Sequence, residues 1–339
     1  MRDLFPETYG AFNEIIRRAY LALINHWPTS WGYVYRWLDG ITNFDERFAR
    51  FSRLKNHLTR VLQRFQPHVI VSSFPPYPYL VRQILATSPE RFRDFKNVVV
   101  ITDSITVNAI WCQCDADYFL APNEQSAAVV RAGGVAPEKI KTFGFPVSPK
   151  FADLAQLSQA NGPVPSQDRQ LPGRNAQRRI LYMIHATTRG SSELVRRLAG
   201  LGVDLTVTIG RVDKLRPAIA AAAAGSNTKI VGWTDELPRL LHESHLLIGK
   251  AGGATTQEAI AASCPMIINH VVAGQEEGNA RLIAETNSGV IALGPAEVAA
   301  QVQRSFAQDG KQWREWAANI SRLSRPCASL DIAEFLLSI

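Results

Sequence analysis

The sequence predicts an α/β protein built from two doubly wound domains, and three observations carry this prediction. Short apolar runs alternate with helical patterns along both halves of the chain. A polar stretch rich in Pro, Gly, Ser, Asn and Gln, residues 155–178, interrupts the alternation near the middle. The 339 residues, 46% of them hydrophobic and 20% charged, suffice for two cores and exclude a disordered or fibrous chain.

The N-terminal half shows four apolar runs, each bounded by turn residues. We expect strands at 68–74, 97–102, 117–121 and 140–143, and helices at 47–65, 77–87 and 123–133. Strands that alternate with helices favour a parallel sheet covered on both faces. Residues 1–46 are expected to be irregular.

The C-terminal half repeats the alternation more completely. Strands are predicted at 179–185, 203–209, 228–231, 245–249, 265–269 and 289–293, with helices at 192–200, 213–224, 235–243, 255–263, 275–286 and 296–308. Six strands with short crossovers make a complete Rossmann-like domain, which binds ligands at the carboxyl ends of its strands. The predicted organisation is an N-terminal domain (1–154), a linker (155–178), a C-terminal domain (179–310) and C-terminal helices that pack back towards the N-terminal domain (311–339).

Charge and cysteine content restrict the partners and the compartment. Residues 1–150 carry 18 basic and 13 acidic residues, so most of the net charge of +7 lies there. This excess suits anionic lipid, an anionic substrate or nucleic acid, and equally an ordinary solvated face. Cys112 and Cys114 have no second pair at zinc spacing, so we expect free thiols and no metal site. No signal peptide or membrane-spanning run is visible, so we expect a cytoplasmic protein, with attachment to the inner face of the membrane left open.

Aromatic residues crowd into positions 20–37 and alternate with arginines. Rings with one apolar and one wet side suit a membrane interface, and they equally suit the core of one domain. The residues concerned are Tyr20, Trp27, Trp31, Tyr33, Tyr35 and Trp37, with Arg17, Arg18 and Arg36 among them.

The most informative segment, residues 246–261, reads L-L-I-G-K-A-G-G-A-T-T-Q-E-A-I-A. An apolar strand enters a turn at Gly252 and Gly253, where the missing Cβ atoms allow close approach of a ligand. The helix expected to begin near Thr255 offers unpaired N–H groups to a pyrophosphate. Thr255 and Thr256 can cap the helix or donate hydroxyls, and the Glu258 carboxylate can accept from both ribose hydroxyls. A plain strand–turn–helix remains the alternative.

Two neighbouring segments add polar groups at strand ends. Residues 230–241 place Gly232 and Trp233 at the end of a strand and Thr234 as a helix cap, so this turn would lie beside a base. Residues 273–279 gather hydrogen-bonding groups suited to sugar hydroxyls, although acidic groups there can also simply complement a helix dipole. This second group is Gln275, Glu276, Glu277 and Asn279.

The order of these motifs resembles family 28 glycosyltransferases, and most closely the diacylglycerol glycosyltransferases and monogalactosyldiacylglycerol synthases. G-W-T-D-E-L-P, I-G-K-A-G-G-A-T-T-Q-E-A, C-P-M-I-I-N and G-Q-E-E-G-N-A follow one another between 232 and 280. V-I-T-D-S at 100–104, A-P-N-E at 121–124 and G-F-P-V-S-P-K-F at 144–151 also fit. The resemblance covers roughly 60–310 and is strongest over 228–283.

The resemblance implies a GT-B fold, in which two Rossmann-like domains face each other across a cleft, and transfer with inversion from a UDP-sugar. It implies no cofactor besides this donor substrate and no metal. It assigns uracil to Gly232 and Trp233, pyrophosphate to Gly253–Thr256, ribose to Glu258 and the hexose to Gln275 and Glu276. Arg211 and Lys250 are expected to neutralise the leaving phosphate, and the expected acceptor is a membrane lipid such as diacylglycerol.

The sequence departs from the family in three places. The loop after the first strand of the C-terminal domain reads I-H-A-T-T-R-G-S-S instead of being glycine-rich, although Thr187 and Thr188 can still bind phosphate. Asn108, on the acceptor side, stands nearest the position of a family histidine. The opening strand and the glycine-rich loop that carries the usual general base are not recognisable, so we expect an incomplete N-terminal domain with Asp103 as the substitute base.

Three other functions were weighed against transfer. A nucleotide-sugar-binding protein without transferase activity would follow from the missing catalytic loop. An epimerase on the same fold would need carboxylates and a histidine in the cleft, a set that the sequence does not assemble. For transfer itself, His185, at the carboxyl end of a strand, is a second candidate base, although a lone histidine there is more often structural. Nucleic-acid binding has only the basic excess behind it, with no arginine run or recognition motif.

Overall fold

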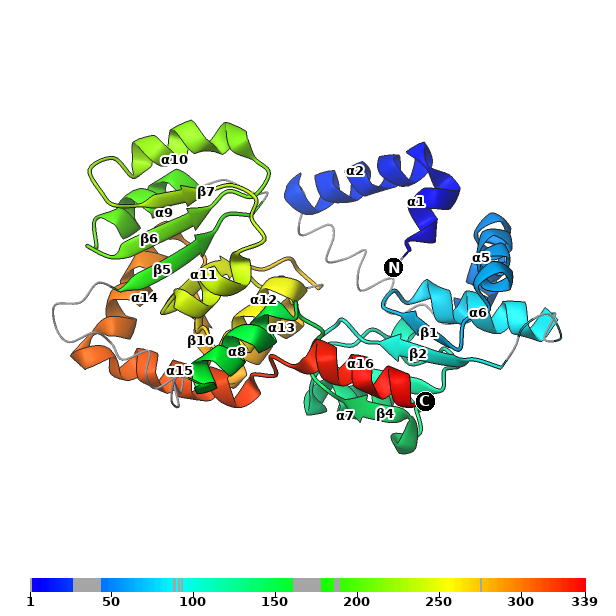
Figure 1. Ribbon diagram of the computed structural model, residues 1–339. Coiled ribbons are helices and arrows are strands. Elements are labelled where there is room, and N and C mark those ends of the chain that lie inside the picture. The colour runs from blue at the N-terminus through cyan, green and yellow to red at the C-terminus, as the bar shows by residue number, and fades with distance from the viewer. Residues whose placement is uncertain are drawn as a thin grey trace. The chain divides into compact units, whose positions relative to one another are not determined.

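The computed structural model describes residues 2–26, 44–87, 90, 92, 94–160, 178–185, 190–274 and 276–339. Contacts divide the chain into two compact units, each an α/β layer structure around a parallel sheet (Figure 1). Unit 1 comprises Met1–Phe145, Ala273–Gln275 and Asp331–Ile339, and unit 2 comprises Pro146–Val272 and Glu276–Leu330. The predicted α/β class with two Rossmann-like sheets is confirmed.

The sheet of unit 1 has the four predicted strands in the order β1-β2-β3-β4, all parallel. They are β1 (Val69–Ser72), β2 (Lys96–Val100), β3 (Tyr118–Ala121) and β4 (Ile140–Thr142). The central strands are near-continuous apolar runs because both faces are covered, as is usual for a parallel sheet.

The helices of unit 1 include two that the sequence did not predict. The two are α1 (Leu4–Tyr9) and α2 (Ala11–His26). The helices that follow them are α4 (Phe44–Ala49), α5 (Ser52–Phe65), α6 (Pro76–Thr87) and α7 (Glu124–Ala132), with 3₁₀ turns η2 (Ala109–Trp111) and η3 (Pro137–Lys139). The expectation of an irregular start is therefore wrong. Asp3 caps α1 by accepting the Phe5 N–H at 3.2 Å, and Gly10, at φ 46°, turns the chain into α2.

The helix predicted over 47–65 is divided into α4 and α5. Its apolar spacing is nevertheless confirmed, because Leu54, Leu58 and Leu62 are buried against Leu80 and Ile84 of α6. The aromatic residues from Trp27 to Trp37 lie outside the described residues. The side chain of Tyr20 lies outside them as well.

Unit 2 holds the six predicted strands, all parallel, in the order β10-β9-β8-β5-β6-β7. They are β5 (Arg179–Met183), β6 (Asp204–Thr208), β7 (Lys229–Val231), β8 (Leu246–Lys250), β9 (Met266–His270) and β10 (Gly289–Ile291). The direction of winding reverses between β5 and β8. In open α/β sheets this switch point is where ligands bind, at the carboxyl ends of the strands.

The helices that cover this sheet agree with the predicted ranges to within a few residues. α9 packs against both α10 and α14, whereas α11 packs against α12 and β5 (Figure 1). The helices are α9 (Ser191–Ala199), α10 (Arg216–Ala222), α11 (Leu237–Glu243), α12 (Gly253–Ala261), α13 (Glu277–Glu285), α14 (Pro295–Phe306) and α15 (Lys311–Leu323), with η4 (Asp213–Leu215) and η5 (Gln308–Gly310).

The expected linker and C-terminal helices need correction. Helix α8 (Lys150–Ala160) occupies the first part of the range expected as linker, because Phe151 and Ala152 are buried and the helix packs against α11. Residues 161–177 lie outside the described residues. α15 belongs to unit 2, where Trp313 and Trp316 are buried in its core, whereas α16 (Ala328–Ser338) places Ile332 against Val98, Val100 and Leu120 of unit 1.

Within the part of the chain that the structure describes, no helix combines the length and the apolarity needed to cross a bilayer.

Candidate functional site

The turn between β8 and α12 lies at the switch point of unit 2. Helix α12 begins at Gly253, two residues earlier than predicted, with Gly252 as an N-cap that makes no side-chain hydrogen bond. A Cβ atom on Gly252 would lie 2.9 Å from Cε and 3.0 Å from Nζ of Lys250. The backbone at Gly252 therefore lies so close to the Lys250 side chain that only glycine fits there without a shift of the lysine. The N–H groups of the first turn of α12 are exposed at the N-terminal end of the helix, which is the arrangement that binds anions.

The two threonines of this turn do not cap the helix, contrary to one expectation. Thr256 is fully buried, and among the described residues its Oγ1 has no hydrogen-bond partner. Thr255 is half-buried, with its methyl group 3.8 Å from the position of a Cβ on Gly249. The cap position falls on Gly252 because the helix begins at Gly253, two residues before the predicted start, which leaves both threonines inside its first turn.

Lys250 and Glu276 form an ion pair at the same turn. Nζ of Lys250 lies 2.5 Å from Oε1 of Glu276, whose side chain is only 6% exposed. The second oxygen, Oε2, accepts the N–H of Val272 at 3.0 Å. Residues predicted for phosphate and for hexose therefore meet directly, and the Glu276 carboxylate is held on both oxygens.

Asn279 has a holding role as well. Its Nδ2 donates to the carbonyl oxygen of Ala251 at 3.1 Å, which ties α13 to the β8–α12 turn. Asn279 is buried, and its Oδ1 has no partner among the described residues. Gln275, Thr187 and Thr188, the remaining predicted residues of this region, lie outside the described residues.

Glu258 lies one turn inside α12 and is half-buried. Burial raises the pKa of its carboxyl from the ordinary value to about 7. The group thus holds its proton over most of the acidic range, because burial disfavours its charged form. A carboxylate of this kind gains from any hydroxyl that donates to it.

Trp233 follows β7 and is exposed by 65%. The guanidinium of Arg211, after β6, lies over its ring with Cζ 5.2 Å from the centroid. A hydrogen of Gly232 points towards Arg216, since a Cβ there would lie 3.5 Å from its Nη2. The structure therefore joins Arg211 to the aromatic platform rather than to Lys250, and the platform is a cation–π pair open to solvent.

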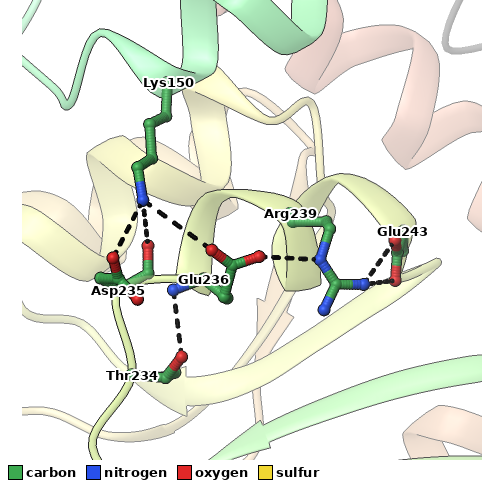
Figure 2. A network of polar contacts seen from close by, with 6 residues as sticks. All are labelled: Lys150, Thr234, Asp235, Glu236, Arg239 and Glu243. Atoms are coloured by element: carbon green, nitrogen blue, oxygen red, sulfur yellow. Dashed lines mark hydrogen bonds and ion pairs between the residues drawn. The ribbon is translucent and has the colours of Figure 1, made fainter.

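The turn after Trp233 is fastened by a polar network (Figure 2). Nζ of Lys150, at the start of α8, lies 3.2 Å from Oδ2 and from the carbonyl oxygen of Asp235, and 3.9 Å from Oε1 of Glu236. Arg239 continues the network to Glu236 and Glu243. Thr234 accepts the Glu236 N–H at 3.0 Å, so it closes this turn instead of capping α11 as predicted, because the helix begins only at Leu237.

Two histidine rings lie face to face at the same edge of the sheet. The ring centroids of His185 and His270 are 4.5 Å apart, with an angle of 31° between the ring planes. Burial, with a contribution from Lys250, lowers the pKa of His185 to about 4 and lowers that of His270. Sequence reasoning named His185 as a lone histidine and missed His270, since only the adjacency of β5, β8 and β9 brings the two together.

The two predicted residues of unit 1 lie beyond the end of β2. Asp103 is half-buried and accepts the indole N–H of Trp111 at 2.6 Å, and desolvation raises the pKa of its carboxyl. Asn108 caps η2 by accepting the Ile110 N–H at 3.0 Å. Between them, Ile105 adopts φ 57°, a conformation that β-branched residues rarely take and that is often found at functional sites.

Comparison with known proteins assigns the chain to a class. A family model described as monogalactosyldiacylglycerol (MGDG) synthase matches residues 1–147. A probable monogalactosyldiacylglycerol synthase 2, chloroplastic, of Oryza sativa subsp. japonica is 26% identical over 98% of this chain and 72% of its own length. The monogalactosyldiacylglycerol synthase of Spinacia oleracea is 25% identical over 98% of this chain and 65% of its own length. The chain resembles the monogalactosyldiacylglycerol synthases.

Solved structures agree on the fold. MurG of Acinetobacter baumannii matches with a TM-score of 0.59 at 12% identity, over 85% of this chain and 78% of that one. A UDP-GlcNAc 2-epimerase from Neisseria meningitidis matches with a TM-score of 0.56 at 14% identity, over 88% and 83%. These matches support the GT-B fold. Together with the synthase relatives they identify the chain as a glycosyltransferase.

The resemblance to the MGDG synthases extends further than the motifs indicated. The motifs cover about 60–310, whereas the relatives align over 98% of the chain. The family model lies entirely in the N-terminal half, where the sequence analysis found the largest departures. The motifs of the C-terminal half were easier to recognise because glycine turns and their polar neighbours are contiguous in sequence.

Proposed function

We propose that this glycosyltransferase moves a hexose from a UDP-sugar to the hydroxyl of a membrane lipid of the diacylglycerol type, with inversion at the anomeric carbon. The observation that carries the proposal is the alignment of MGDG synthases along almost the whole chain. The β8–α12 turn supports the donor half of the reaction, because it combines a helix N-terminus, a glycine contact and a lysine at one point.

In the proposed complex the exposed ring of Trp233 and the turn at Gly232 hold the base. The N–H groups from Gly253 to Thr256 hold the diphosphate, and the Glu258 carboxylate accepts from the ribose hydroxyls. Glu276 and the predicted Gln275 contact the hexose. Ribose hydroxyls that donate to Glu258 would favour its ionised form, which offsets the desolvation that raises its pKa.

Asp103 is the proposed general base. The acceptor hydroxyl must lose a proton as it attacks, and burial raises the pKa of the Asp103 carboxyl, which makes it a stronger base than an ordinary aspartate. The indole N–H of Trp111 donates to Oδ2 of this carboxylate, and the backbone of Asn108 also hydrogen-bonds to the carboxylate, so both contacts orient it.

A membrane surface is the proposed setting for the acceptor half. Helix α2 exposes Phe12 by 61%, Ile15 by 62% and Ile16 by 53%, while Arg17 and Arg18 pair with Glu14 on the same helix. Exposed apolar side chains beside cationic ones are typical of helices that lie in a lipid interface.

The test is a transfer assay with diacylglycerol in anionic vesicles and three donors: UDP-galactose, UDP-glucose and UDP-N-acetylglucosamine. We expect a hexosyl lipid, detected by mass spectrometry, from one of the three. Glu276→Gln should reduce kcat/KM by about 100-fold or more, since it removes the charge that pairs with Lys250 and replaces one acceptor oxygen at the sugar by an amide donor. Glu285→Gln, an exposed residue at the other end of α13, is the matched control and should retain activity.

Two outcomes of the transfer assay would contradict the proposal, and each would favour a different function. UDP binding without transfer to any lipid would favour a nucleotide-sugar-binding protein, and conversion of the UDP-sugar without acceptor would favour an epimerase. Loss of transfer in Asp103→Asn with unchanged UDP affinity is expected if Asp103 is the base. Retained transfer would remove it from that role.

A further inference from the structure

Three adjacent strands of unit 2 end in cationic or titratable side chains. β9, β8 and β5 are neighbours in the sheet, and Lys250 and His270 are paired in register as the last residues of β8 and β9. The N–H of Ala251 donates to the carbonyl oxygen of His270 at 3.0 Å, which fixes this pairing. His185 follows β5 and stacks on His270 with 4.5 Å between ring centroids.

The fixed charges of this cluster cancel. Among the described residues, the charged groups that act on the two rings are Lys250, on both, and Glu276, on His270. These two groups form a single ion pair of 2.5 Å, so the fixed cation that acts on the rings within the described residues is committed before any ligand arrives. With both rings neutral, the cluster carries no net charge to offer to an anion.

A nucleoside diphosphate brings at least two negative charges to this position. The dipole of α12 offsets only part of such a charge. An anion within several ångströms favours the protonated form of an imidazole, whereas two rings at stacking distance disfavour double protonation. The cluster can therefore accept one proton, shared by the pair, when an anion is bound.

We propose that the stacked pair His185–His270 takes up one proton when a nucleoside diphosphate binds, and so supplies the cation that the Lys250–Glu276 ion pair withholds. The inference rests on the proposed donor site. In the free protein, burial and Lys250 keep both rings neutral near pH 7. In the complex the diphosphate reverses that preference, so binding and protonation are linked and strengthen each other.

The experiment is titration calorimetry with UDP at pH 6.5 in several buffers that differ in heat of ionisation. The slope of the observed enthalpy against that heat counts the protons exchanged. UDP itself changes ionisation on binding, so the decisive quantity is the difference between the wild-type protein and His185→Gln/His270→Gln. We expect the wild type to take up about one proton more per UDP than the double variant.

The affinity gives a second readout. The dissociation constant of the wild type should rise between pH 5.5 and pH 7.5 more steeply than that of the double variant, by up to about tenfold per pH unit. His57→Gln is the control, because His57 lies in unit 1, bound to Thr8. It should behave as the wild type in both measurements. Thermal unfolding without UDP checks that each variant folds.

Equal proton uptake in the wild type and a folded double variant, both of which bind UDP, would overturn this inference and leave the donor site intact. Absence of UDP binding by the wild type would instead overturn the proposed function. The single variants His185→Gln and His270→Gln test whether the two rings share the proton. We expect each of them to retain about half of the extra proton uptake or more.

Discussion

At the scale of single residues, the site is defined by contacts that no local pattern contains. The Lys250–Glu276 pair joins residues on different elements, and Asn279 reaches back to Ala251. Sequence reasoning placed all of them near a sugar nucleotide, because glycine turns and polar helix starts are visible in sequence. It could not predict that they contact one another, since this depends on the order of β8, β9 and their helices.

Glu258 provides a prediction that depends on pH. Its folded pKa, about 7, lies above the ordinary value of 4.5, so the folded state binds more protons between these values. Stability should therefore fall as pH rises from about 4.5 to about 7 and stay lower above that. Glu258→Gln removes the ionisable group. The free energy of unfolding of the variant should therefore exceed that of the wild type by about 1–3 kcal/mol at pH 8, with no such gain at pH 4.

Urea unfolding at pH 4 and pH 8 measures this difference. Glu277→Gln serves as the control, because its side chain is exposed. An equal gain at both pH values would show that amide packing, and not ionisation, is responsible. The variant should also lose UDP affinity, so a residue that destabilises the free protein would be retained for its ligand.

At the scale of elements, the apolar runs decided most of the fold. All ten predicted strands are present because parallel strands, buried on both faces, read as short continuous apolar segments. The failures lie where that signal is absent. The sequence does not indicate α1 and α2, because their aromatic residues hide the helical period. Residues 155–160, the second half of α8, fall in the predicted linker because that stretch is rich in polar residues.

The pairing of β9 with β10 provides a prediction about packing. A Cβ on Gly289 would lie 2.0 Å from the carbonyl oxygen of Met266, its register partner. Gly289→Ala must push β10 away from the sheet, so we expect a loss of about 2–4 kcal/mol in the free energy of unfolding. Gly294→Ala, with nothing within 4 Å of the new Cβ, should cost less than about 1 kcal/mol.

Chemical unfolding of both variants checks this expectation. Because β10 is the edge strand, a loss confined to Gly289→Ala would tie the stability of unit 2 to this close backbone approach. Similar losses in the two variants would mean that glycine flexibility, and not the contact with Met266, sets the difference.

At the scale of the whole molecule, the resemblance to the MGDG synthases and the GT-B fold lead to one requirement. If the proposed function holds, the chain binds uridine nucleotides in preference to other nucleotides, at the site that we propose in unit 2. Fold similarity alone does not demand this, because transferases and an epimerase share the architecture.

The direct test is thermal unfolding of the whole chain with UDP, ADP and GDP in turn, for the wild type and Glu258→Ala. UDP at about 100 times its dissociation constant should add about 2.7 kcal/mol to the free energy of unfolding of the wild type, ADP and GDP should add little, and Glu258→Ala should lose the response. Equal stabilisation by all three nucleotides, or none by UDP, would contradict a uridine-nucleotide donor site.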